Sequence, residues 1–130
     1  MRNATDLRQK VLEASLALIE EGGLDRLSMR EVARKSGVSH QAPYYYFGDR
    51  EAILAAIAGE GFLTLGQSFL RAVDQAGSEP TKALEAIGRA YVGFALRHPA
   101  YFQAMFRADA IPLDRYPDVR RRSVFELAER

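Results

Sequence analysis

The sequence contains no cysteine and only two histidines among its 130 residues. The absence of cysteine excludes disulfide bonds, thiolate nucleophiles and zinc sites built on thiolates. The two histidines, His40 and His98, lie far apart in the sequence, and neither has neighbours at metal-ligand spacing. There is also no nucleophile beside a base and no phosphate-binding glycine loop. We therefore expect no catalytic residues, no metal site and no cofactor.

The chain also lacks an excess of charge of either sign. Its 18 lysines and arginines nearly balance 17 aspartates and glutamates, which leaves a net charge of +1. The balance differs locally, because the stretch from Arg26 to Arg50 holds five basic residues against two acidic ones, a difference of +3 (5 − 2). That local excess is the kind of footprint that contact with phosphates requires.

Long hydrophobic runs are missing as well. We expect no membrane-spanning segment, and the first ten residues, MRNATDLRQK, have no apolar centre typical of a secretory signal. No stretch alternates as a half-buried strand does, and apolar and charged contents of 48% and 27% are ordinary for a globular protein. The expectation is an all-α, cytoplasmic protein without a membrane partner.

Residues 28–36 are predicted to form a short helix with a defined start. Ser28 and Glu31 have the spacing of a capping box, in which the hydroxyl accepts from the Glu31 amide and the carboxylate returns to the Ser28 amide. Leu27 and Val32 flank the box as a hydrophobic staple. Gly37 follows where the helix must stop, because glycine adopts the left-handed conformation at little cost.

A second short helix is predicted directly after this turn. Ser39 is a plausible N-cap for it, Phe47 is expected in the core, and Gly48 ends it before Asp49 caps the next helix. Helix, glycine-containing turn and helix is the helix-turn-helix pattern, whose second helix enters the major groove of DNA.

This stretch resembles the DNA-binding domain of the TetR (tetracycline-repressor) family of transcriptional regulators. The resemblance covers the first half of the chain well and the second half loosely. The residues that carry it are Ser28, Arg30, Val32, Ala33, Gly37, Val38, Ser39, Tyr44, Phe47, Asp49, Arg50, Glu51 and Leu54.

We expect two domains: a three-helix DNA-binding domain over residues 1–50, extending to about residue 57, and a helical ligand-binding and dimerisation domain over 51–130. Thr5 is a plausible N-cap of the first helix, and the Gly22–Gly23 pair ends it. The resemblance implies two further helices at the C-terminus that pair across a two-fold axis. The second domain is therefore expected to be incomplete at Arg130.

The second half is predicted to consist of helices throughout. A long helix begins after Asp49, and its glycines from 59 to 61 indicate either a hinge or close helix packing. A break at 76–80 precedes a helix that starts at Pro80 and stops near His98. Leu84, Ile87, Tyr91, Phe94 and Ala95 mark one face of that helix, and a short helix begins at Pro99. A last helix is predicted from about Pro117.

The resemblance implies DNA contacts of two kinds. Contacts to phosphate fix the register, whereas contacts to base edges read the sequence. The residues expected at the DNA are Ser28, Arg30, Ser39, His40, Gln41, Ala42, Tyr44, Tyr45, Tyr46 and Arg50.

His40, Gln41 and Ala42 are the candidates for base contact, since glutamine pairs with adenine and a small residue meets a thymine methyl group. By resemblance Tyr44 and Tyr46 donate to phosphates. Several bland alternatives stay open. Ser28 could be a cap alone, Arg30 a solvated charge, and Tyr46 a residue packed inside with Phe47.

Pro43 departs from the aliphatic residue that is commoner in the family. It falls within the first turn of the second short helix, where losing an amide costs less than in the middle of a helix. It leaves the helix-turn-helix intact and puts only the details of base contact in doubt.

A dense set of aromatic side chains suggests a ligand pocket between the helices of the second domain. Core packing is the simpler reading for each single member, and the ligand role rests on the family resemblance. The candidate residues are Phe62, Phe69, Tyr91, Phe94, His98, Tyr101, Phe102, Met105, Phe106 and Phe125.

Together these features predict a transcriptional repressor that binds a palindromic, double-stranded operator as a homodimer. A small apolar or aromatic effector would release it from the DNA. The alternative is a helical ligand-binding or interaction module without specific DNA binding.

Overall fold

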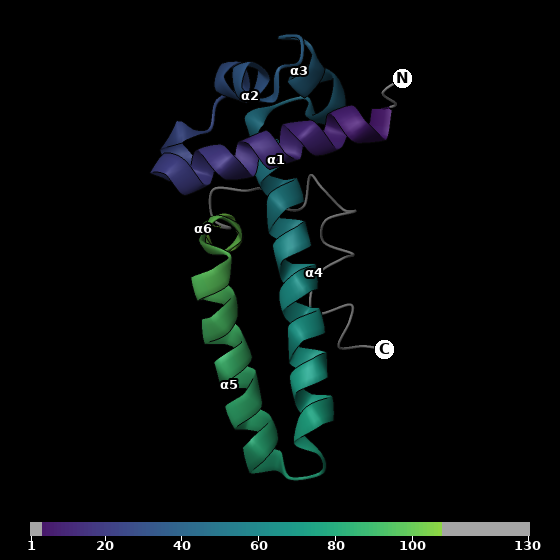
Figure 1. The fold of residues 1–130 in the computed structure, drawn as a ribbon, viewed down its shortest axis with the longest axis vertical. Helices are drawn as coiled ribbons and strands as arrows, with labels where there is room; N and C mark the ends of the chain where they lie inside the picture. The colour runs from purple at the N-terminus through teal and green to yellow at the C-terminus, as the bar shows by residue number, and fades with distance from the viewer. Residues whose placement is uncertain (1–3, 108–130) are drawn as a thin grey trace.

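The computed structural model describes residues 4–107 (Figure 1). Every regular element in this range is a helix, which confirms the all-α expectation. The helix predicted from Pro117 lies outside the described residues. The elements are α1 Ala4–Gly22, the short 3₁₀ helix η1 Leu24–Arg26, α2 Met29–Ser36, α3 Ala42–Phe47, α4 Arg50–Ala76, α5 Pro80–Arg97 and α6 Pro99–Phe106.

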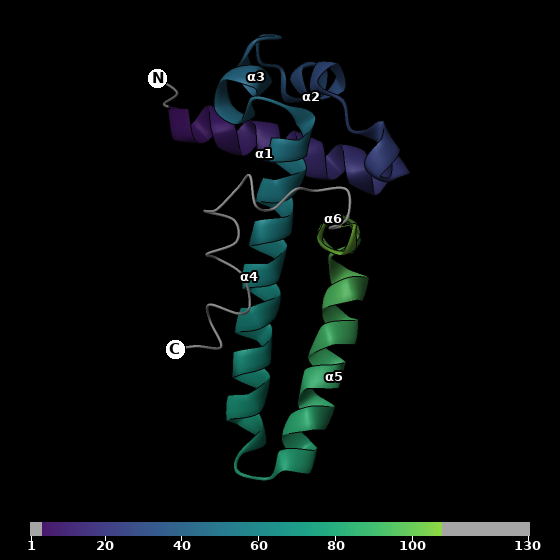
Figure 2. The ribbon, with the colours of Figure 1, turned by 180° about the vertical axis from the view of Figure 1, so that it is seen from behind.

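The helices form a small head on a long helical hairpin. Figures 1 and 2 show α1 lying across one end of α4, with α2 and α3 on the far side of α1. α4 runs away from this head, α5 returns beside it, and α6 lies in the corner between α5 and α1. The helix-turn-helix pair thus lies at the end of the molecule opposite the α4–α5 connection.

One hydrophobic core joins the head to the hairpin. Val11, Leu12 and Leu18 of α1 are buried against Val32 of α2 and Ile57 of α4. The same core continues through buried residues of α5 and α6, namely Phe94, Ala100, Ala104 and Met105. Because burial of a large apolar side chain contributes about 1.5–3 kcal/mol, this shared core fixes the angle between the two parts.

The ends of the first helix differ slightly from expectation. Helix α1 begins at Ala4, so Thr5 lies inside its first turn, and the prediction that Thr5 is the N-cap is wrong. At the other end α1 stops at Gly22, and Gly23 has a φ of 81°, as predicted for a glycine stop. Leu24 and Leu27 are buried and hold this connection against the core.

Helix α4 is long, and its glycines serve close packing. A Cβ atom at Gly61 would lie 2.5 Å from Sδ and 2.9 Å from Cγ of Met105 in α6. Of the two readings left open for residues 59–61, this contact supports close packing at Gly61. No contact of the described residues supports a hinge at these glycines.

Helix α4 is longer and more apolar than the sequence analysis expected of any segment. By length and composition alone it could cross a membrane, because Glu60 is the only charged residue between Glu51 and Arg71. The expectation that no segment is long and apolar enough is therefore wrong. Half of the apolar window is buried inside the protein, as in the core helix of a folded domain.

The predicted apolar face of α5 is buried only near its C-terminal end. Phe94 is 1% exposed, whereas Leu84 is 72% exposed. The reason is that, among the described elements, α6 covers α5 only near their junction at His98, while the first turns of α5 lie beside α4. Helical spacing identifies a face but does not tell how far along it a partner extends.

Candidate nucleic-acid interface

Helix α2 is held in place by the predicted start and stop signals. The Ser28 hydroxyl accepts from the Glu31 amide at 3.1 Å, which is one half of the capping box. The other half is not formed, because the Glu31 carboxylate accepts from Arg34 at 2.6 Å instead. Gly37 ends the helix with φ 72° and ψ 19°, the left-handed conformation predicted for it.

The second helix of the pair begins later than predicted. The N-cap of α3 is Gln41, without a side-chain cap bond, so the prediction that Ser39 is the N-cap is wrong. Ser39 instead accepts, through its carbonyl, from the Ala42 amide at 3.1 Å in a turn. His40 and Gln41 consequently lie in this turn, ahead of a helix of six residues.

Pro43 explains the late start. It stands in the first turn of α3, where its missing amide would find no helical partner in any case. Its ring is buried, so it fastens the turn to the rest of the head. The departure from the commoner aliphatic residue therefore leaves the helix-turn-helix intact, as expected.

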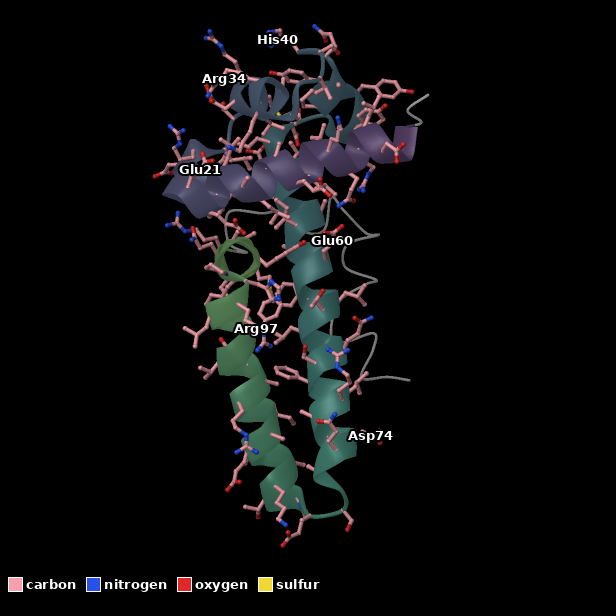
Figure 3. The ribbon with its side chains drawn as sticks, in the orientation of Figure 1. Glu21, Arg34, His40, Glu60, Asp74 and Arg97 are labelled. Atoms are coloured by element: carbon pink, nitrogen blue, oxygen red, sulfur yellow. The ribbon has the colours of Figure 1, made fainter. Side chains whose placement is uncertain are left out.

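The candidate base-reading residues share one exposed end of the molecule. Ser39, His40 and Gln41 are exposed, and Ala42 is half-buried behind them. Figure 3 shows His40 and Arg34 at the tip of the head, pointing away from the hairpin. An exposed turn that leads into a helix can place short polar side chains against base edges.

The three consecutive tyrosines differ sharply in exposure. Tyr45 is 81% exposed and Tyr44 is 52% exposed, whereas Tyr46 is half-buried. Tyr46 packs edge-on against Tyr45, with ring centroids 4.9 Å apart. Phe47 is partly buried against the core, and the Arg8 guanidinium lies 4.8 Å from its ring centroid. Tyr46 is therefore the inward-lying member of the three, and two phenol groups face outward.

Two of the basic side chains on α2 are already paired. Arg34 bonds Glu31, and Lys35 bonds Glu21 of α1. Each hydrogen bond, followed by the charge of the same partner, lowers the pKa of the carboxyl group involved. Arg30 is exposed and has no ion pair with the described residues, which leaves its charge available for phosphate.

Arg50, which is expected at the DNA, makes two hydrogen bonds within the protein. Its Nε donates to the Leu27 carbonyl at 2.7 Å, and its Nη2 donates to the Leu24 carbonyl at 2.6 Å. These bonds tie the start of α4 to η1 and its connection to α2. Arg50 is half-buried, and its guanidinium supplies donors to two backbone carbonyls.

The aromatic candidates of the second half pack in and around the core. Phe94 is buried in it, as is the neighbouring candidate Met105, and Phe62, Phe69 and Phe102 are partly buried against it. Four of the rings form a chain of contacts between α4, α5 and α6, with centroids 4.7–6.3 Å apart. These four are Phe62, Tyr91, Phe102 and Phe106. Phe125 lies outside the described residues.

A polar pair accompanies the aromatic residues. The Tyr101 hydroxyl donates to a Glu60 carboxylate oxygen at 3.2 Å. Burial, with the charge and hydrogen bond of Glu60, raises the pKa of Tyr101 to about 12. His98 lies at the junction of α5 and α6. The centroid of its ring lies 5.2 Å from that of Phe94 and 5.9 Å from that of Tyr101.

Comparisons with known proteins address the whole arrangement. The family model "Bacterial regulatory proteins, tetR family" matches residues 11–57, and "Tetracyclin repressor-like, C-terminal domain" matches 84–129. The chain belongs to the TetR family.

Individual TetR-family relatives cover parts of the chain. It is 38% identical over 56 residues to the uncharacterized HTH-type transcriptional regulator YvdT of Bacillus subtilis, covering 43% of this chain and 28% of that protein. It is 30% identical over 101 residues to the HTH-type transcriptional repressor KstR of Mycolicibacterium smegmatis, covering 78% and 49%. The chain thus spans about half or less of the length of the curated relatives it matches.

A solved structure gives the same result for the fold. A Rhodococcus sp. RHA1 protein of unknown function has a TM-score of 0.70 and 40% identity, covering 82% of this chain and 55% of that one. The TetR-type head and the helical hairpin therefore occur together in a known structure.

Sequence reasoning missed two features. One is the Arg8 contact with Phe47, which links α1 to α3 and which helical spacing alone could not show. The other is a cleft lined by arginines between α4 and α5. Arg89 and Arg97 are eight residues apart, about two turns on one helix face, and that spacing is the signal that could have drawn attention to it.

Proposed function

We propose that this protein is a sequence-specific transcriptional repressor that binds a palindromic operator as a homodimer in the cytoplasm. A small molecule bound in the helical second domain releases it from the DNA. One observation carries the proposal: Arg30, which has no ion pair with a described residue, lies with exposed His40, Gln41, Tyr44 and Tyr45 at one end of the helical head.

The base-reading role falls to the turn before α3 and to its first residues. Gln41 has the donor and acceptor for a bidentate pair with adenine, and His40 can donate to a guanine acceptor. Ala42 is small enough to let the backbone approach a thymine methyl group. Tyr45, the most exposed of the tyrosines, accompanies them on the groove side.

The phosphate-binding role falls to the residues that flank this turn. Arg30 offers an exposed guanidinium, and Ser28 offers its amide while its hydroxyl caps α2. Tyr44 offers a phenol group for donation to phosphate. Arg50 acts indirectly in this scheme, because its bonds to Leu24 and Leu27 hold α4 and η1 in register.

The path from the effector to the DNA runs through helix packing. α6 contacts both α1 and α4, so a ligand that shifts α6 moves the base of the head. In a dimer the two recognition helices must lie about 34–36 Å apart, one turn of DNA. A ligand that favours another spacing lowers affinity by population shift.

Selection from a random pool of double-stranded DNA tests this proposal. The protein is expected to enrich a palindrome whose half-sites lie about one helical turn apart. Gln41→Ala should relax the preference at one position of each half-site, whereas Lys82→Ala on the far hairpin should enrich the same motif. A pool without any enriched motif would favour the alternative, a ligand-binding module without specific DNA binding.

A further inference from the structure

A cleft of about 360 Å³ opens between α4 and α5, away from the helix-turn-helix. Its size falls in the range of small-molecule sites. Three arginines line it: Arg71 from α4, and Arg89 and Arg97 from α5. Among the described residues, no acidic side chain lines it, and none of the three arginines has an ion pair. Within that part of the chain the cleft therefore concentrates positive charge.

The shape of the cleft follows from small residues at its walls. Ala72 of α4 and Ala86 and Ala90 of α5 line it, so the two helices leave room between them. Outside the lining, Gly93 leaves room for the Arg97 side chain, because a Cβ atom there would lie 3.0 Å from the nearest Nη atom of Arg97. The Arg97 guanidinium thus folds back along its own helix, and Figure 3 shows Arg97 on α5 near the side that faces α4.

Neutral polar groups complete the lining. Gln75 contributes an amide, and the Ser68 hydroxyl accepts from Arg71 at 3.4 Å. A single solvated arginine on a helix surface would not indicate a binding site. Three that converge on one concave site repel one another, and a bound anion removes that repulsion.

We propose that this cleft binds the anionic group of a small organic molecule, a carboxylate or a phosphate. Arginine suits both, because its planar guanidinium donates two parallel hydrogen bonds to paired oxygens. The inference rests on the proposed function in one respect, since it gives the effector of the repressor an anionic group. Binding itself requires no DNA.

Thermal unfolding with two probes tests the binding step. Inorganic phosphate and succinate are added separately, with chloride adjusted to keep ionic strength constant. At least one probe is expected to raise the Tm of the wild type in a saturable manner, and the tighter probe identifies the preferred group. A Tm that neither probe raises would overturn the proposal.

Matched variants separate a site from a general salt effect. Arg97→Gln is expected to weaken the tighter probe about tenfold, as the loss of a charged hydrogen bond does. Lys82→Gln removes one charge from the same helix outside the cleft and should leave the affinity unchanged. Both side chains are exposed, so both variants should fold. Equal weakening in the two would overturn the site.

The same variants distinguish this inference from the proposed function. If the anion binds but no operator is enriched from random DNA, the cleft stands and the repressor role fails. If an operator is enriched but no anion binds, the repressor stands and the cleft fails. If both bind, the tighter probe should lower operator affinity in Lys82→Gln and not in Arg97→Gln.

Discussion

Met105 of α6 lies so close to Gly61 of α4 that a side chain at position 61 would overlap its thioether. Gly61→Ala is therefore expected to lower the free energy of unfolding by a net value of about 1–2 kcal/mol, because overpacking this buried contact costs about 2–3 kcal/mol. Alanine's better helix propensity, worth about 1 kcal/mol, is already included in this net value. Urea unfolding followed by circular dichroism measures it.

Gly88 of α5 provides the matched control. A Cβ atom there would meet nothing within 4 Å, so Gly88→Ala should raise the free energy of unfolding by about 0.5–1 kcal/mol. Opposite signs at the two glycines would confirm that α6 is seated on α4. Equal stabilisation by both substitutions would show that Met105 is free to move away.

Arg50 is predicted to act on stability. Arg50→Met removes the charged donors to the Leu24 and Leu27 carbonyls, and should lower the free energy of unfolding by about 2 kcal/mol. The free energy of unfolding of Arg50→Lys should lie between those of the wild type and Arg50→Met, because a single ammonium group replaces a guanidinium that reaches two carbonyls. Unchanged stability together with weaker operator binding would restore Arg50 to the phosphate contacts.

Arg30 is predicted to act on DNA affinity. Arg30→Ala should weaken all DNA sequences about equally and reduce the slope of log affinity against log salt by about 1, as loss of one phosphate contact does. Its stability should stay within about 0.5 kcal/mol of the wild type because the side chain is exposed. Fluorescence anisotropy measures the slope of log affinity against log salt. A slope in the variant equal to that of the wild type would show that Arg30 does not contact a phosphate.

Tyr101 should ionise late. Its pKa of about 12 means that the folded state holds the phenol proton more tightly than the unfolded state, whose tyrosines titrate near 10. Its contribution to stability is thus fully present below pH 10 and is lost as the pH rises from 10 towards 12. An absorbance titration at about 295 nm, where tyrosinate absorbs, should show in the wild type a phenol that ionises at a pH above 10. Tyr101→Phe should remove this group.

Local signals in the sequence predicted much of the fold because they act within one or two turns. Ser28, Gly37, Gly48 and Asp49 occupy the caps and stops expected of them, and Pro99 starts a helix as predicted. The exception is Ser39, which is not the N-cap predicted for α3. The helix begins later, with the buried ring of Pro43 in its first turn.

Partners distant in the sequence could not be predicted from spacing. The sequence predicts a phosphate contact for Arg50 and gives no sign of the two carbonyls, more than twenty positions away, that lie beside its guanidinium. Leu84 matched a helical face that no described residue covers well. Arg71 and Arg97 share a cleft only because α5 folds back along α4.

The central claim is that the exposed turn before α3 and the start of that helix read a specific DNA sequence. Fluorescence anisotropy tests it, with the protein titrated onto a labelled fragment from upstream of its own gene, in excess unrelated DNA. The account predicts saturable binding that survives the competitor, and a loss of that preference in Gln41→Ala. Binding that the competitor abolishes, or a Gln41→Ala variant with unchanged preference, would contradict it.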